Sequence, residues 1–268
     1  MNDPGSSSLD ELLYQDAGLG SPGMTWRDKD CAILQGRDYV AQFDAISSLL
    51  SRHEHADAST SAEIKAIENL PQKNHRDVDE WCDLLHWSTY KSAAHSMAAV
   101  GMLAPFFESL FVHAFQGIRT KFYPDNPIPP GHPRSGMGKA DEFWDCHLVF
   151  AANGKKKKSC KKGLVLGIME LAEAVNLKTP HLPPNLSATL TPLFQYRHNM
   201  FHGGLEWPAE ERKKFTAQIS QENWGTLFSS AMRDALDDVP VIFYINKSFI
   251  NQCMDLVEKL MKSLRLVL

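Results

Sequence analysis

The feature that most constrains the fold is a run of apolar residues with helical spacing from about Val78 to Arg119. Apolar side chains recur there at every third or fourth position, which places them on one face of an α-helix. Pro105 lies inside the run and is expected to kink or divide the helix, because proline removes a backbone N–H and clashes with the preceding turn. One charge, Glu108, interrupts the apolar half. Since burying an unpaired carboxylate is costly, Glu108 either lies at the helix edge or has a partner.

Further segments show helical spacing and are separated by polar or proline-rich stretches. No internal repeat and no alternation of strands with helices is present, so the sequence predicts an all-α antiparallel helical bundle with long loop insertions. A link is expected at residues 57–61, followed by a short helix that begins at 61 and ends before Pro71. The other helices are expected at residues 24–53, 141–151, 163–175, 187–204, from 206 onward and 248–264.

The remaining segments define the domain organisation. Residues 1–23 are rich in Gly, Ser, Pro and Asp and are predicted to form a flexible tail, which leaves residues 24–268 as a single all-α domain. Residues 122–138 carry five prolines and three glycines and must form a long loop. Residues 239–245 are apolar and β-branched, which fits either a short extended segment or the lead-in to the last helix.

Composition bounds the compartment and the partners. A formal net charge of −4 gives no general attraction to nucleic acid or membranes, so a polyanion would need a local patch. The five cysteines are scattered and odd in number, which indicates reduced thiols in a cytoplasmic protein. The amino terminus lacks the apolar core of a signal peptide, and no apolar run reaches the roughly 20 residues that span a bilayer. We therefore expect no membrane association.

The strongest positive patch is a run of six lysines between residues 155 and 162. Such a run is most simply a solvated turn. It would equally suit contacts with a phosphate backbone, because lysines displace counterions whatever the nucleotide sequence. The RNA-binding hypothesis for this patch involves Lys155, Lys156, Lys157, Lys158, Lys161 and Lys162.

A second cluster of polar residues lies at residues 193–204, at the end of an apolar helix that two glycines stop. It contains Arg197, His198, Asn199 and His202. His198 and His202 are four residues apart and share a helical face, but Asn199 stands where a zincin would need glutamate and no third ligand is evident, so no metal or other cofactor is expected. The cluster can also be a simple helix end, where cations are favoured by the helix dipole.

The spacing Arg197-x4-His202 resembles the Arg-x4-6-His motif of the HEPN superfamily of all-α nucleases. In that family a polar residue often follows the arginine, as His198 does here, and an earlier helix carries an apolar-Glu-apolar element like that around Glu108. The resemblance covers at most residues 80–262. It implies catalytic roles for Arg197 and His202 and supporting roles for His198, Asn199, Glu108 and Tyr196, with Glu108 orienting Arg197.

The chemistry implied by this resemblance is metal-independent RNA cleavage through attack by the ribose 2′-OH. Histidine titrates near neutrality and can move the protons, while arginine can stabilise charge on the phosphorane. Residues five apart on a straight helix point about 140° apart. We therefore expect Gly203 and Gly204 to let His202 turn back where the helix unwinds. The family also builds its cleft between two copies of this helix, which implies a homodimer with a composite site.

The expected function is an endoribonuclease that acts as a toxin or antiphage-defence effector, with RNA and an antitoxin or regulatory protein as partners. The alternatives are a non-catalytic helical module that binds RNA or a protein, and a purely structural helical dimer. One departure from the family matters for regulation. Related toxins often carry tyrosine two residues after the histidine, where an antitoxin attaches AMP, whereas this chain has Gly204.

Overall fold

The computed structural model describes residues 37–125, 128, 130–151, 159–177, 182–235 and 238–266. It is mostly helical, with 72% of residues in helices, which confirms the all-α class. The expected tail at 1–23 and the first part of the predicted helix at 24–53 lie outside the described residues.

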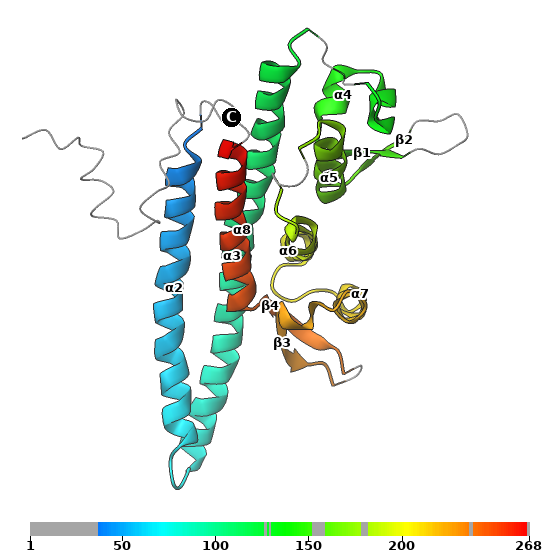
Figure 1. Ribbon diagram of the computed structural model, residues 1–268. Coiled ribbons are helices and arrows are strands. Elements are labelled where there is room, and N and C mark those ends of the chain that lie inside the picture. The colour runs from blue at the N-terminus through cyan, green and yellow to red at the C-terminus, as the bar shows by residue number, and fades with distance from the viewer. Residues whose placement is uncertain are drawn as a thin grey trace, which may run out of the picture.

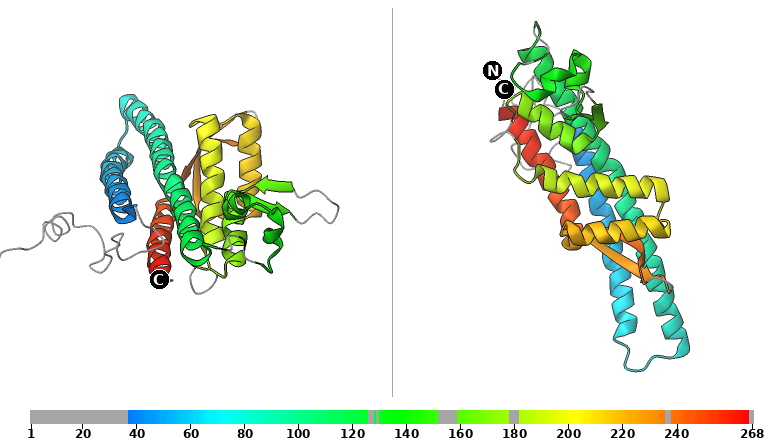
Figure 2. Two further views of the ribbon diagram at one scale, coloured as in Figure 1. Left: turned by 90° about the horizontal axis from the view of Figure 1, so that it is seen from above. Right: turned by 90° about the vertical axis from the view of Figure 1, so that its right-hand side faces the viewer.

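The framework is a long antiparallel hairpin of α2 (Tyr39–Glu68) and α3 (His75–Phe122), which lie side by side in Figures 1 and 2. Asn74 and Asp77 form a capping box that satisfies two backbone N–H groups at the start of α3. The turn end of the hairpin projects beyond the rest of the molecule in Figure 1. The other half of α3 packs against α6 and α8 and carries the buried core.

Two expectations about this hairpin are wrong. The link predicted at residues 57–61 is part of α2, which contains no glycine or proline to stop it, and Thr60 within it is buried and bonded to Lys91 Nζ of α3 at 2.9 Å. Nor does Pro105 divide α3. The Pro105 side chain is exposed, while Phe106 and Phe107 beside it are buried. Burial of these aromatic rings offsets the lost backbone hydrogen bond, which costs about 3 kcal/mol.

Four later helices lie close to their predicted positions: α5 (Leu164–Ala174), α6 (Leu186–Gly203), α7 (Ala209–Gln221) and α8 (Lys247–Leu266). Pro208 precedes α7 as its N-cap. In the side view of Figure 2, α6 and α7 cross the long hairpin, whereas α8 runs along it. The carboxyl end of α6 thus lies across α3, close to Glu108.

The described residues also contain two small antiparallel hairpins. The first joins β1 (Leu148–Ala151) to β2 (Ser159–Lys162), and the second joins β3 (Phe228–Arg233) to β4 (Pro240–Ile245). The helix predicted at 141–151 is therefore wrong beyond Trp144, where α4 (Ala140–Trp144) ends. For residues 239–245 the extended alternative is confirmed. The predicted loop at 122–138 holds one short 3₁₀ helix, η2 (Pro133–Met137), and a second, η3 (Trp224–Thr226), precedes β3.

A single aromatic-rich core joins α3, α6, β4 and α8. Its rings include Tyr196, Trp207, Phe215 and Phe243, which contact one another at centroid distances of 5.0–6.2 Å. Contrary to the sequence-based expectation, α3 is long and apolar enough to cross a membrane, with an 18-residue window of mean hydropathy 1.5. That window is 56% buried inside the protein, as is usual for a core helix.

Candidate active site

Helix α6 presents two different faces at its carboxyl end. Leu193, Tyr196 and Met200 are buried, and the Tyr196 hydroxyl donates to the carbonyl oxygen of Phe243 at 2.8 Å. Burial raises the pKa of Tyr196. His198 and His202 are exposed on the opposite side. The sequence therefore fixes the orientation of α6 through its apolar residues, and Tyr196 anchors the helix instead of reaching the polar face.

Arg197 lies at the boundary between these faces and contacts α3. Its Nη1 donates to Glu108 Oε2 at 3.4 Å, and the two side chains are 38% and 30% exposed. The guanidinium also lies over the Phe194 ring, 6.0 Å from its centroid. Glu108 thus has the partner that its apolar surroundings require. This contact is longer than the 2.7–2.9 Å of a strong charge-assisted hydrogen bond, so Arg197 is held only loosely.

The other oxygen of Glu108 binds a histidine that the sequence did not single out. His147 Nε2 lies 2.9 Å from Glu108 Oε1, and His147 Nδ1 lies 2.8 Å from Asp145 Oδ1. The four side chains Arg197, Glu108, His147 and Asp145 form a row in which a potential cation alternates with a carboxylate. We call this row the charged row. It connects α6, α3 and the turn that precedes β1.

Protonation of His147 is favoured by its two carboxylate partners. Burial lowers the pKa of His147, but the hydrogen bonds to Glu108 and Asp145 and the charges of both carboxylates raise it, and the net result is a pKa above the ordinary value. With both ring nitrogens facing carboxylates, the imidazolium is the form that can donate to both at once.

A fully buried arginine holds the turn that carries Asp145 and His147. Arg134 donates to the carbonyl oxygens of Phe143, Leu148 and Asp145, each at 2.7 Å, and to Glu170 Oε1 at 3.0 Å. Glu170 of α5 in turn accepts from the Phe150 N–H of β1. The guanidinium therefore replaces the hydrogen bonds that a regular helix would have supplied to these carbonyl groups.

Close packing of α5 completes this support. A Cβ added at Gly167 would lie 2.1 Å from the Cys146 carbonyl oxygen and 2.8 Å from that of Leu148. Only glycine allows α5 to approach the turn so closely. In addition, the Asp145 carboxylate accepts from the His147 backbone N–H at 2.9 Å, an arrangement typical of an Asx turn.

The two exposed histidines of α6 lie beside each other. The His198 and His202 rings are 4.6 Å apart between centroids, with planes tilted by 60°. The expectation that His202 sits where the helix unwinds is wrong, because α6 continues to Gly203 and positive φ begins at Gly204. His202 therefore points about 140° away from Arg197 around the axis. Among the described residues, no hydrogen bond or ion pair joins the two side chains.

The remaining predicted residues are placed as follows. Asn199 is buried, and its Oδ1 accepts from Gln195 Nε2 at 3.4 Å, so it faces along α6 and away from the exposed histidines. Lys161 and Lys162 lie in β2, and the structure describes only their backbone. Lys155 to Lys158 lie outside the described residues.

Sequence reasoning missed His147, Asp145 and Arg134. The error came from the helix predicted at 141–151, in which residues two apart point to different sides, so an Asp-x-His pair carries no signal. The sequence Asp145-Cys-His147 followed by the β-branched and aromatic run of β1 would have indicated a turn before a strand. Nothing in the proline-rich loop marks Arg134 as buried.

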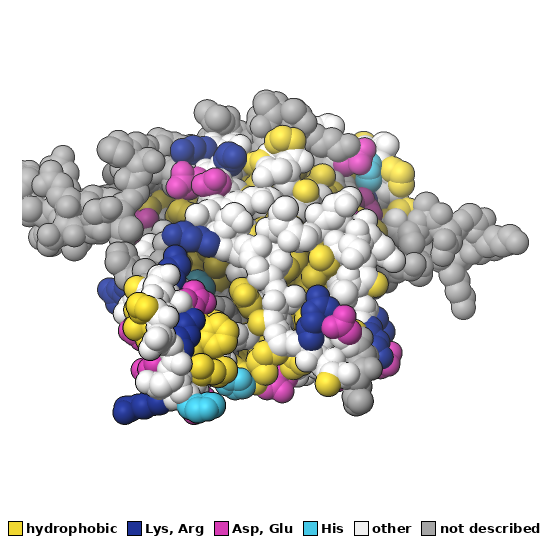
Figure 3. All heavy atoms as spheres, turned by 90° about the horizontal axis from the view of Figure 1, so that it is seen from below, with side chains coloured by type: hydrophobic (Ala, Val, Ile, Leu, Met, Phe, Trp, Pro, Cys, Tyr) yellow, Lys and Arg dark blue, Asp and Glu magenta, His cyan; other side chains and the backbone are white. Residues whose placement is uncertain are grey.

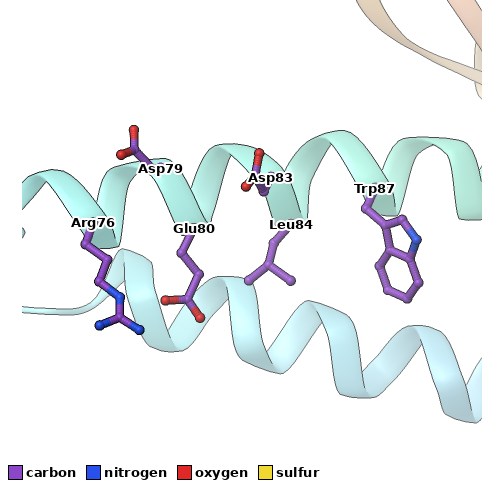
Figure 4. A pocket seen from close by; sticks show the side chains of 6 residues that line it. All are labelled: Arg76, Asp79, Glu80, Asp83, Leu84 and Trp87. Carbon is purple, nitrogen blue, oxygen red and sulfur yellow. The ribbon is translucent and has the colours of Figure 1, made fainter.

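Other surface features lie apart from this site. A hollow of about 500 Å³ at the amino-terminal end of α3 is shown in Figure 4, and it is lined by Arg76, Asp79, Glu80, Asp83, Leu84 and Trp87. Trp87 precedes Glu108 by about 30 Å along α3 at 1.5 Å per residue. Figure 3 shows the end of the molecule with the hairpin turn, where side chains of both charges are interspersed with apolar ones. Among the described residues, no three His, Cys, Asp or Glu side chains are grouped to hold a metal ion.

Comparisons with protein-family models, with curated proteins and with solved structures find no match for this chain, so the resemblance to the HEPN superfamily rests on the residues themselves.

Proposed function

We propose that the protein is a metal-independent endoribonuclease of the HEPN type, with Arg197 and His202 as catalytic residues. The observation that carries the proposal is the end of α6, where a half-exposed arginine in contact with Glu108 shares the last turns of the helix with two exposed imidazoles. Arginine suits the charge of a phosphorane, and imidazole suits proton transfer at neutral pH.

In the proposed reaction the ribose 2′-oxygen attacks the adjacent phosphorus and the bond from phosphorus to the 5′-oxygen breaks. His202 accepts the 2′-OH proton, and a proton returns to the departing 5′-oxygen, so no net proton is gained or lost. Arg197 binds the phosphate oxygens, where negative charge grows. The products are a 2′,3′-cyclic phosphate and a 5′-hydroxyl. His198, next to His202, is available to orient it or to bind phosphate.

The 140° between Arg197 and His202 makes a site within one chain unfavourable, so we propose a homodimer in which two α6 helices face each other. Phe201, which is 56% exposed on the same end of α6, supplies apolar surface for such a contact. Arg197 of one copy would then meet His202 of the other. In this arrangement the protein acts as a cytoplasmic toxin or antiphage-defence effector, controlled by an antitoxin or another regulatory protein.

The principal test is incubation of the purified protein with total RNA in EDTA. The Arg197→Ala and His202→Ala variants should each lose cleavage by about 100-fold or more, the usual cost of removing one acid–base group or one charge stabiliser. Matched controls are Arg233→Ala and His75→Ala, which remove the same residue types at exposed positions on β3 and at the start of α3. Equal cleavage by all five proteins would refute the catalytic assignment.

The composite site has its own test by subunit mixing. Arg197→Ala and His202→Ala subunits are denatured together and refolded. A mixed dimer holds one intact composite site, so activity should return, whereas a site within one chain would stay inactive in every subunit. Sedimentation at several concentrations reports whether dimers form at all.

The second candidate function is a non-catalytic helical module that binds RNA or a protein. It is favoured by the ion pair of Arg197 with Glu108, which reduces the charge available to a phosphate. This candidate predicts no cleavage of bound RNA and no toxicity when the protein is expressed.

A further inference from the structure

The charged row contains two groups that the proposed reaction does not use, His147 and Asp145. His147 lies between Asp145 and Glu108, and both contacts are shorter than that between Glu108 and Arg197: 2.8 and 2.9 Å against 3.4 Å. Glu108 therefore bonds more closely to His147 than to Arg197, although arginine is the stronger bidentate partner for a carboxylate.

Geometry excludes His147 from direct proton transfer to a substrate. Each of its ring nitrogens already faces a carboxylate oxygen, so neither is available to a ribose hydroxyl or a leaving oxygen while these contacts last. The turn that carries His147 is also fixed, since the His147 carbonyl oxygen accepts from Gly163 N at 2.8 Å and Arg134 holds the neighbouring carbonyl groups. An imidazole that is held in place by two hydrogen bonds acts on its neighbours through its charge.

We propose that His147 is a positioning residue for Arg197: by binding one oxygen of Glu108 it weakens the Glu108–Arg197 ion pair and so leaves the Arg197 guanidinium able to transfer to an RNA phosphate. This inference rests on the proposed function, because it needs Arg197 to contact RNA. Without the positive charge of His147, the Glu108 carboxylate would hold Arg197 more strongly and would compete better with the phosphate.

The titratable and charged groups around His147 come from four helices and from its own turn. They are Glu108 of α3, Arg197 of α6 behind it, Asp145 and Cys146 of the turn, and Arg134 of η2 paired with Glu170 of α5. Burial raises the pKa of the Cys146 thiol to about 12, so the thiol does not supply a charge to this set. His147 is the member of this set whose side-chain type titrates near neutrality.

The direction of the pH effect follows from these contacts. The pKa of His147 is raised in the fold, so the imidazolium and a weakened Glu108–Arg197 pair persist to higher pH than an ordinary histidine would allow. As pH rises through that pKa, the row loses one positive charge and Glu108 retains Arg197. RNA affinity through Arg197 should therefore fall on the alkaline side.

The test measures binding of a single-stranded RNA oligonucleotide with 2′-deoxy substitution, which cannot be cleaved by 2′-OH attack, from pH 6 to pH 9. His147→Gln should weaken binding by about threefold to tenfold at pH 6, within the range of coupling between contacting residues. Its affinity should change less with pH than that of the wild type. In an Arg197→Ala background, His147→Gln should have no effect, which a merely structural role of His147 would not produce.

Each contrary outcome has a distinct meaning. If Arg197→Ala weakens binding but His147→Gln leaves the pH profile unchanged, or causes the same loss with and without Arg197, then His147 does not position Arg197 and only this inference fails. If Arg197→Ala alters neither binding nor cleavage of ordinary RNA, the proposed function fails and this inference with it. Should His147→Gln not fold, as judged by circular dichroism, Asp145→Asn provides the same comparison, because it removes the charge of the second partner of the imidazole.

Discussion

Arg134 and Arg197 are both paired with a glutamate, yet their surroundings are opposite. Arg134 is fully buried, and its donors bind three backbone carbonyl oxygens at 2.7 Å as well as Glu170. Arg197 is 38% exposed and makes one long contact with Glu108. A guanidinium whose donors are all engaged holds structure together. One that is loosely held at the surface can exchange its partner for a ligand.

The largest effect expected from this comparison is on stability. Arg134→Met keeps the length of the side chain but removes the charged partner of Glu170 and the hydrogen bonds to three backbone carbonyl groups, so the free energy of unfolding should fall by about 3–5 kcal/mol. Urea unfolding monitored by circular dichroism measures this. A loss below about 1 kcal/mol would mean that Arg134 is not the support of the turn before β1.

A smaller loss is expected when the turn is displaced without touching a charge. Gly167→Ala places a methyl group against the Cys146 carbonyl oxygen and should cost about 1–3 kcal/mol, as overpacking does. The matched control is Gly225→Ala, where an added Cβ meets nothing within 4 Å. Equal unfolding midpoints for the two variants would contradict the close approach of α5 to the turn.

For Arg197 the comparison predicts the reverse balance between stability and function. Arg197→Met should lower the free energy of unfolding by less than about 1 kcal/mol, because half-exposed ion pairs contribute little. RNA cleavage by the same variant should nevertheless be lost. If Arg197→Met destabilised the protein as much as Arg134→Met, Arg197 would be a structural residue and the contrast would disappear.

The smallest effect concerns pH. The pKa of His147 is raised by folding, so its contribution to stability is present below its ordinary pKa of about 6.5 and is lost as pH rises through the folded value. The wild type should therefore lose slightly more stability than His147→Gln between pH 6 and pH 9. Because the side chain is 40% exposed, solvent screening keeps this difference small, below about 1 kcal/mol. Parallel stability curves for the two proteins would argue against a charged His147.

Much of the fold was predictable because apolar periodicity reports which face of a helix is buried. It located α3, α5, α6 and α8 within a few residues, and the cost of burying an unpaired carboxylate gave two alternatives for Glu108, a place at the helix edge or a partner. The same signal misplaced a link inside α2, since Ser and Thr residues resemble a loop when their packing against α3 is not visible.

The sequence by itself determined the end of α6, where the order of apolar and polar residues places Arg197 at the boundary of the core and His198 and His202 on the solvent side. Only the tertiary structure decided what surrounds Arg197. Glu108, His147 and Arg134 are far apart in the chain, and their contacts depend on α5 approaching a turn through Gly167. Local propensity describes the path of the backbone, whereas a row of charges shared by several elements arises only when those elements pack together.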